Sequence, residues 1–275
     1  MKYQVGCDLE YDVSQTTPFV FNITPFENQH QRIIQENLEI EPSIELEYYV
    51  SPLLGNRYFR AIAPAGKFKI QYRAEVEIFP QEEDPTSIPE VPPDRLPLAT
   101  FYYLYPSRYC QSDRLMRLAQ SEFGHLVPDY SRVTAICNWI YENITYQYGS
   151  SNSQTSACDT AIERIGVCRD FAHLGIAFCR ALNIPARFVT AYAYGLKPAD
   201  FHACFEAYLG NCWYLFDPTR LVPREGLIRI GTGRDAADVS FATIFGTAQM
   251  TKMDLLVDLL DSQVLTETTA AISNF

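Results

Sequence analysis

The sequence predicts an α+β protein in which an antiparallel β-sandwich precedes a domain of helices packed on an antiparallel sheet. Apolar residues recur with a period of two through the first 79 residues. Beyond residue 99 the period lengthens to that of a helix, and it shortens again near residue 186. A proline-rich segment separates the two patterns. The length of 275 residues also favours two domains, because single domains usually hold about 100 to 150 residues.

The first 79 residues have the pattern of half-buried strands. Residues 67–78 are the clearest case, because apolar and charged side chains alternate there, so that one face packs on a core and the other meets water. The expected core face consists of Phe68, Ile70, Tyr72, Ala74, Val76 and Ile78. Similar alternation marks residues 5–13 and 44–50. We therefore assign residues 1–79 to a β-sandwich domain.

Residues 80–98 are predicted to link the two domains. This segment, PQEEDPTSIPEVPPDRLPL, holds six prolines, and proline supports neither a helix interior nor a central strand. Most of the acidic excess of the chain lies before residue 100. Residues 99–275 are then expected to form the second domain.

The second domain is expected to contain three helices followed by three strands. The first helix has Ser112 as its N-cap and Gly124 as its stop, and apolar stripes mark two more helices over residues 131–144 and 168–182. Period-two segments then predict strands at 186–194, 201–209 and 212–216. Gly210-Asn211 is typical of a two-residue turn between the last two strands.

Charge and hydropathy exclude several classes of partner. The formal net charge of −11 disfavours nucleic acid and anionic membranes, because both need a basic surface. The first ten residues lack the apolar segment of a signal peptide, and no later stretch approaches the roughly 18 apolar residues of a membrane span. We therefore expect a cytoplasmic protein. The eight cysteines include no C-x-x-C pair, which favours packed, reduced thiols.

Two motifs that resemble cofactor sites are set aside. Residues 231–236 have the G-x-G-x-x-A spacing of a dinucleotide-binding loop, but no βαβ unit surrounds them. His202, Cys204 and Cys212 carry zinc-ligand chemistry, but on alternating strand positions they lack the knuckle usual in structural sites. We therefore expect no cofactor and no metal site.

Cys168 is the candidate nucleophile. In G-V-C-R-D it lies where a loop enters a helix, so unpaired backbone N–H groups and the helix dipole can stabilise a thiolate. Position alone does not separate this role from that of a packed thiol, so a base is needed. His173 lies five residues further on and points about 140° away around the helix. We therefore expect His173 to be a core or surface residue.

His202 is the candidate base, and Asp217 is the residue expected to orient it. A two-residue turn at Gly210-Asn211 makes Leu209 face Cys212, and the same register places Asp217 beside His202 on one face of the hairpin. A carboxylate there accepts the imidazole N–H and favours the charged ring. Cys168, His202 and Asp217 then form the nucleophile, base and orienting acid of a cysteine acyl-transfer enzyme.

Four motifs resemble the core of the transglutaminase-like superfamily: GVCRDFAHL at 166–174, NIPARFV at 183–189, DFHACFEAY at 200–208 and WYLFDPT at 213–219. The resemblance implies a papain-like fold and gives Cys168, His202 and Asp217 the catalytic roles. The first domain also resembles the region that precedes this core in bacterial members. Residues 229–246 are typical of that bacterial group, but no chemistry is assigned to them.

The predicted function is a cysteine hydrolase that cleaves amide bonds of a peptide or protein through a thioester at Cys168. Bacterial proteins of this architecture resemble proteases or amidases, and no calcium-binding loop is present. Two alternatives stay open: amine transfer onto the same thioester, and a non-catalytic binding module that keeps the fold. The sequence does not identify a second oxyanion donor, for which Trp139, Gln154 and Ser156 are candidates, nor the oligomeric state.

Overall fold

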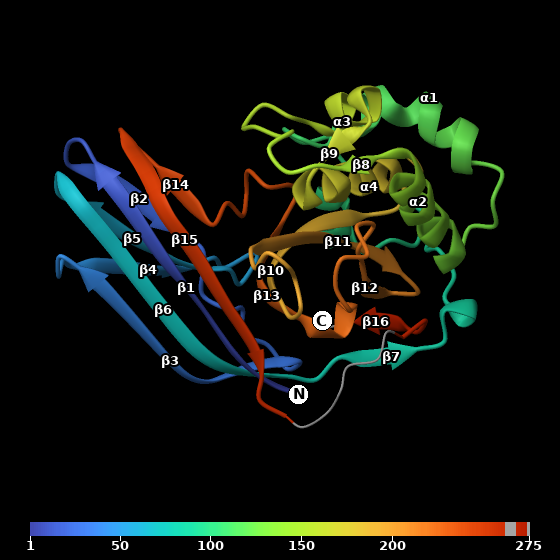
Figure 1. The fold of residues 1–275 in the computed structure, drawn as a ribbon. Coiled ribbons are helices and arrows are strands. Elements are labelled where there is room, and N and C mark those ends of the chain that lie inside the picture. Colours follow the sequence, from blue (N-terminus) through green and yellow to red (C-terminus); the bar gives the residue numbers. More distant parts are fainter. Residues whose placement is uncertain (262–267, 274–275) are drawn as a thin grey trace.

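The computed structural model describes residues 1–261 and 268–273 and shows a β-sandwich beside an α+β domain (Figure 1). The sandwich contains two antiparallel sheets of four strands each, in the orders β15-β1-β6-β3 and β14-β2-β5-β4. Their strands are β1 (Lys2–Val13), β2 (Thr17–Phe21), β3 (Gln31–Glu41), β4 (Leu46–Val50), β5 (Arg57–Ala63), β6 (Gly66–Ile78), β14 (Ala242–Ile244) and β15 (Ala248–Leu259).

Aromatic side chains fill the space between the two sheets. Along β6 every second residue from Phe68 to Ile78 is buried, as the alternation predicts. The rings of Phe19 and Phe21 on β2 stack with centroids 5.4 Å apart. The ring of Phe68 on β6, in the other sheet, lies 5.3 Å from that of Phe19. The predicted β-sandwich is therefore confirmed for the N-terminal region.

The two strands β14 and β15 correct the predicted domain boundaries. We assigned all of residues 99–275 to the catalytic domain, but β15 pairs with β1 along its length and β14 pairs with β2. Figure 1 shows β15 beside β1, although they come from opposite ends of the chain. These pairings satisfy backbone groups of β1 and β2 that would otherwise lie at open sheet edges. The chain thus passes into the second domain, returns to the sandwich with β14 and β15, and reaches the second domain again at residues 271–273, where Ala271 is buried in that domain's core.

The proline-rich segment lies against the second domain. It contains the short strand β7 (Gln81–Glu83), which pairs with β16 (Ala271–Ser273), and the 3₁₀ turn η1 (Pro85–Ser87); a second 3₁₀ segment, η2 (Leu98–Tyr103), follows. The Gly210 N–H donates to the Pro89 carbonyl at 2.9 Å, and Arg132 Nε donates to Glu90 Oε1 at 2.6 Å. The linker is therefore held in one position.

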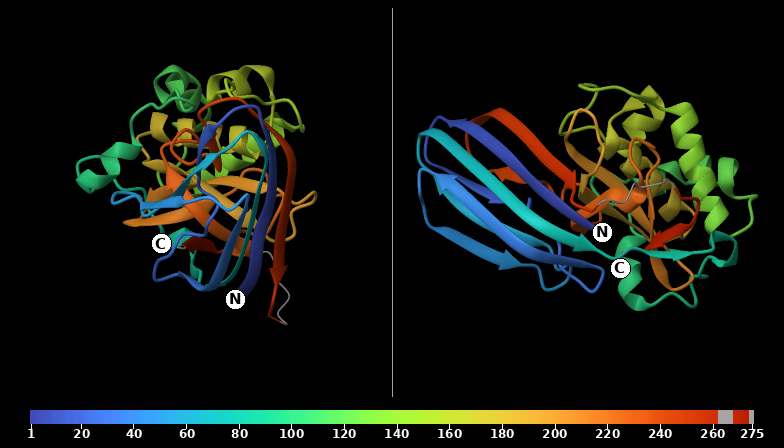
Figure 2. Two further views of the ribbon diagram at one scale, coloured as in Figure 1. Left: turned by 90° about the vertical axis from the view of Figure 1, so that its left-hand side faces the viewer. Right: turned by 60° about the horizontal axis from the view of Figure 1, so that its bottom comes forward.

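The second domain contains four helices and one antiparallel sheet, and the helices gather on one side of that sheet (Figure 2). The sheet order is β12-β11-β10-β13. A two-residue parallel pair, β8 with β9, lies beside the helices. The elements are α1 (Ser112–Phe123), α2 (Tyr130–Asn143), β8 (Thr145–Tyr146), α3 (Ala157–Glu163), β9 (Ile165–Gly166), α4 (Cys168–Ala181), β10 (Ala186–Ala193), β11 (Phe201–Leu209), β12 (Cys212–Phe216), η3 (Arg224–Gly226) and β13 (Leu227–Gly233).

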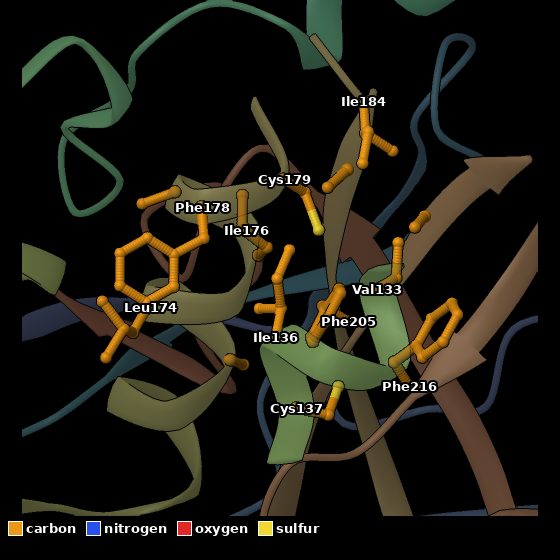
Figure 3. Packing of buried hydrophobic residues seen from close by; sticks show 14 of the residues in the cluster. Val133, Ile136, Cys137, Leu174, Ile176, Phe178, Cys179, Ile184, Phe205 and Phe216 are labelled. Carbon is orange, nitrogen blue, oxygen red and sulfur yellow. The ribbon is translucent and has the colours of Figure 1, made fainter. Parts of the chain in front are cut away.

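Helix α4 is the centre of this domain. All of its residues from Asp170 to Ala181 are buried. Figure 3 shows side chains of α2 and α4 meeting Phe205 and Phe216 from the sheet. A Cβ added at Gly175 would lie 2.5 Å from the Phe205 ring, so a glycine lets the helix approach β11 closely. Within the described residues, no helix is long and apolar enough to cross a membrane.

A buried cluster of charges ties three strands of this sheet together. Glu206 on β11 accepts a hydrogen bond from Arg187 on β10 at 2.5 Å and another from Arg229 on β13. All three side chains are almost fully buried. Burial raises the pKa of Glu206, but the two guanidinium groups outweigh it and hold this pKa below its usual value. The cluster therefore braces the strand that carries His202.

We expect Glu206→Ala to lower the free energy of unfolding by about 3 to 5 kcal/mol, because it leaves buried guanidinium charge without its carboxylate. The matched control is Asp12→Ala, which breaks an exposed ion pair with Lys67 and should cost about 1 kcal/mol or less. Urea denaturation followed by far-UV circular dichroism measures both. Equal losses in the two variants would contradict a bracing role for Glu206.

Candidate active site

Cys168 is the first residue of α4, and its neighbours fix the turn into the helix. The buried Asp170 carboxylate accepts the Val167 N–H at 3.0 Å and the Ser151 hydroxyl at 3.0 Å. It thereby satisfies a backbone donor beside the helix start. A Cβ at Gly166 would lie 2.8 Å from the Asp170 Cβ, so this turn requires the glycine. The backbone around Cys168 is thus held in one conformation.

His202 and Asp217 meet at the end of the β11–β12 hairpin. Leu209 pairs with Cys212, and Phe205 pairs with Phe216, so the predicted register is confirmed. His202 Nε2 lies 2.7 Å from Asp217 Oδ2. The other carboxylate oxygen, Oδ1, accepts from the backbone N–H and the hydroxyl of Thr219 at 2.9 and 2.8 Å. Both oxygens of Asp217 are therefore engaged.

This pairing sets the charge of the buried imidazole. Burial lowers the pKa of His202, but Asp217 and then Cys168 raise it, and the net result is a pKa of about 10. Burial raises the pKa of Asp217, but His202 and Thr219 outweigh it and hold it below its usual value. Among the described residues, Nδ1 of His202 has no regular hydrogen bond. Because Nε2 is held by Asp217, Nδ1 is the nitrogen left to face Cys168.

Tyr146 is a site residue that the sequence analysis missed. The β8–β9 pair brings it beside Cys168, and its ring packs on Phe171 with centroids 5.6 Å apart. Burial raises the pKa of the Tyr146 phenol, Cys168 raises it further, and contact with the Cys168 backbone N–H opposes them. Two-residue strands leave no periodic signal in a sequence, so this placement could not be read from the pattern.

The three residues considered as second oxyanion donors have other contacts. Trp139 Nε1 donates to Glu122 at 3.1 Å, and the Ser156 hydroxyl donates to Asp159 at 2.6 Å in the capping box of α3. Gln154 lies in a turn, where its backbone N–H donates to the Asn152 side chain at 2.8 Å. Trp139 and Ser156 therefore stabilise helices.

His173 is a core histidine, as expected, but it also holds a loop. Its ring stacks on Tyr109, with centroids 5.0 Å apart, and Nε2 accepts the Ala236 N–H at 3.1 Å. Burial lowers the pKa of His173, and Arg169 and Arg180 lower it further, so the ring is neutral. This contact gives a structural role to residues 233–239 (GRDAADV), which belong to the 229–246 segment to which no chemistry was assigned.

The loop after β13 forms one wall of a pocket of about 260 Å³. Cys168 and His202 both line this pocket, together with polar side chains that include Arg169 and Asp200. The apolar walls consist of Tyr109, Phe188, Phe201, Ile230, Val239 and Phe241. Three larger hollows on the sandwich, of about 450, 470 and 340 Å³, are lined by neither cysteine nor histidine. The arrangement can therefore present a carbonyl group to the thiol from an apolar pocket.

Cys168 differs from the other cysteines in its surroundings. Six of the eight are buried, whereas Cys168 and Cys212 are partly exposed. Burial raises the pKa of Cys110 to about 12, which keeps such a thiol protonated and inert. Cys212 lies 3.3 Å from the Ser273 hydroxyl. No group of three metal-ligating side chains gathers in residues 1–261 and 268–273.

Comparison with known proteins places the chain in a family. Residues 117–218 match the family described as the transglutaminase-like superfamily, and residues 1–92 match the bacterial transglutaminase N-terminal domain. The crystal structure of a candidate cysteine protease from Cytophaga hutchinsonii is 46% identical in sequence, with a TM-score of 0.96 over 99% of this chain and 97% of that chain. The chain belongs to the transglutaminase-like superfamily, and its fold is of the cysteine-hydrolase type.

Mycobacterial relatives are more distant. An uncharacterised protein of Mycobacterium leprae is 31% identical over 137 residues, which is 46% of this chain and 49% of that protein. The match thus spans about half of each. An uncharacterised protein of Mycobacterium bovis is 26% identical over 291 residues and is covered to 92% of its length.

We expect the His202 ring to remain charged through pH 8 and to lose its proton near pH 10. An unfolded histidine has a pKa near 6.5, so the pair stabilises the fold fully below about pH 6.5, and this contribution fades as the pH rises through about 10. In Asp217→Asn the carboxylate that offsets the effect of burial is removed, so the pKa of His202 should fall to about 7 or lower. Ring ¹⁵N NMR measures both, with His202→Gln to assign the signal. A wild-type midpoint near 6.5 would show that the carboxylate does not hold the charge.

Proposed function

We propose that this protein is a cysteine hydrolase that cleaves amide bonds in peptides or proteins through a thioester at Cys168. The observation that carries the proposal is the buried His202–Asp217 contact of 2.7 Å beside a cysteine at the start of a helix. A charged imidazole and a helix N-terminus both favour the thiolate over the thiol. The candidate cysteine protease at 46% identity supports the same class.

In the first half-reaction the Cys168 thiolate attacks the amide carbonyl carbon, and the electron pair of the C=O bond moves onto oxygen. The tetrahedral intermediate collapses, the C–N bond breaks, and the His202 imidazolium gives its proton to the leaving amine. The product is a thioester at Cys168 with a neutral His202. Asp217 keeps Nε2 protonated throughout, so that Nδ1 is the nitrogen that exchanges the proton.

In the second half-reaction His202 Nδ1 takes a proton from water, and the resulting hydroxide oxygen attacks the thioester carbonyl. The C–S bond breaks, the carboxylic acid leaves and ionises, and the thiolate–imidazolium pair returns. Asp217 stabilises the charged ring each time it forms. Amine transfer would use a primary amine in place of water, so the same three residues would serve both reactions.

Two donors are proposed to bind the oxyanion of the tetrahedral intermediates. The Cys168 backbone N–H is one, because as the first residue of α4 it has no acceptor within the helix. The Tyr146 phenol is the second, because it neighbours Cys168 and its raised pKa keeps it a hydrogen-bond donor at neutral pH. A donor at such a position is worth about 10²- to 10³-fold in kcat.

We expect Cys168 to react with iodoacetamide much faster than the other thiols at pH 6, because a thiolate is the reactive form. Cys168→Ala should keep its fold and lose this rapid labelling, while the Ser variants of the buried Cys158, Cys179 and Cys204 should keep it. Mass spectrometry of the labelled peptides measures the site and the rate. Rapid labelling that persists in Cys168→Ala would contradict the assignment.

We expect hydrolysis to exceed amine transfer when the protein is incubated with an acyl-donor peptide panel and a labelled primary amine at millimolar concentration. Both products are followed together, with Cys168→Ala as the blank. Dominant Cys168-dependent amine incorporation would show that the protein is an amine transferase, and absence of both products would favour a binding module.

Tyr146→Phe should keep the rapid alkylation of Cys168 but lower kcat about 10²- to 10³-fold, because it removes the proposed second oxyanion donor.

A further inference from the structure

Asp200 is a charged residue in the pocket that the proposed chemistry does not use. It directly precedes β11, two residues before His202, and both side chains line the same pocket. It lines the pocket that holds Cys168 and is half-buried there. It therefore lies in the pocket where the proposed substrate would bind.

The Asp200 carboxylate has room for a ligand. Its Oδ1 accepts the Phe201 N–H at 2.7 Å. In the part of the chain that the structure describes, Asp200 forms no ion pair, and it receives no side-chain hydrogen bond. Burial raises the pKa of Asp200, and the Phe201 N–H and the charge of His202 only partly offset this. A cationic partner stabilises the charged form of a half-buried carboxylate of this kind.

The other charges around the pocket are already paired. Arg169 contacts Asp170 at 3.3 Å and donates to the Ser151 hydroxyl at 2.7 Å. His202 is paired with Asp217. Among the described residues that line the pocket, Asp200 is the one carboxylate, and it forms no ion pair with the two cationic side chains there.

We propose that Asp200 selects substrates that carry a basic side chain, lysine or arginine, beside the cleaved bond. This proposal rests on the proposed function, because it names the substrate of the same site. The methylene stem of such a side chain can lie along Phe201 and Phe241, which stack with centroids 5.0 Å apart, while its charged end reaches the carboxylate. The aromatic faces add cation–π attraction.

The charge of the whole protein agrees with a cationic substrate. The formal net charge is −11, which attracts positively charged peptides over long range and raises their rate of encounter. Asp200 then provides the local selection, because only a cation that enters the pocket can pair with it. An acidic side chain in the same place would meet like charge and be rejected.

The test uses N-acetylated peptidyl acyloxymethyl ketones, which alkylate an active-site thiolate without needing turnover. Lysine, norleucine or glutamate is placed at either of the two positions before the electrophile. Norleucine matches the stem of lysine without its charge. The second-order rate of Cys168 modification is measured by mass spectrometry at neutral pH, with iodoacetamide as a probe that has no side chain to recognise.

We expect the lysine probe to react about tenfold faster than the norleucine probe in one of the two series, and the glutamate probe to be the slowest. Asp200→Asn should abolish the lysine advantage while the norleucine and iodoacetamide rates stay within about twofold. Asp200→Lys should make the glutamate probe faster than the lysine probe. Added salt should reduce the lysine advantage. The control Glu142→Gln removes one exposed charge from α2 and should change no ratio.

Three results would overturn the proposal, and they differ from failure of the proposed function. Equal rates for lysine and norleucine in both series, with rapid iodoacetamide labelling, reject the basic subsite alone. Equal slowing of every probe in Asp200→Asn, with a shifted pH profile, shows that Asp200 acts through His202. In the third result, norleucine probes with a free amino terminus react faster than their N-acetylated forms only when Asp200 is present, with no advantage for lysine. That result would show that the carboxylate binds an α-amine. Absence of rapid labelling by iodoacetamide rejects the enzyme itself.

Discussion

The candidate site depends on the contact between His202 and Asp217. This contact forms because of the register of the β11–β12 hairpin. Gly210 and Asn211 adopt positive φ values of 53° and 71°, which a two-residue turn of this kind requires. A hairpin longer or shorter by one residue would turn Asp217 to the opposite face of the sheet. Glu206, on the same strand as His202, links β11 through its buried ion pairs to both β10 and β13, so that the strand cannot shift without exposing charge.

The sequence predicted those features whose signals are local. Alternation in β6, the helix entry at Cys168 and the turn at Gly210-Asn211 each depend on a few adjacent residues, and together they brought Cys168, His202 and Asp217 to one place. The return of β14 and β15 to the sandwich was not predicted, because the partner of a strand is chosen by contacts between distant segments. Tyr146 was missed for the same reason: its position depends on pairing between two residues near 145 and two near 165. The catalytic roles themselves stay predictions.

The core of the sandwich continues into one wall of the pocket beside Cys168. Tyr192 and Ile230 belong to strands of the catalytic sheet but are buried in the core of the sandwich, where the Tyr192 hydroxyl donates to the Ile23 carbonyl at 2.7 Å. Ile230 and Phe241 also line the pocket beside Cys168. Because these apolar surfaces are continuous, the shape of the pocket depends on both domains. The N-terminal domain therefore supports one wall of the pocket.

The two buried histidines show why chemistry is assigned to one of them. Burial disfavours charge on both rings, yet the pKa of His173 is lowered and that of His202 is raised. The difference lies in the group at Nε2. A backbone N–H of Ala236 donates to His173 and requires a neutral ring, whereas the Asp217 carboxylate accepts from His202 and favours a charged one. A neutral histidine whose Nε2 accepts a backbone N–H can hold a loop, while a charged histidine with Nδ1 facing a thiol can supply a proton. Partner chemistry, and not burial, therefore separates the structural histidine from the candidate base.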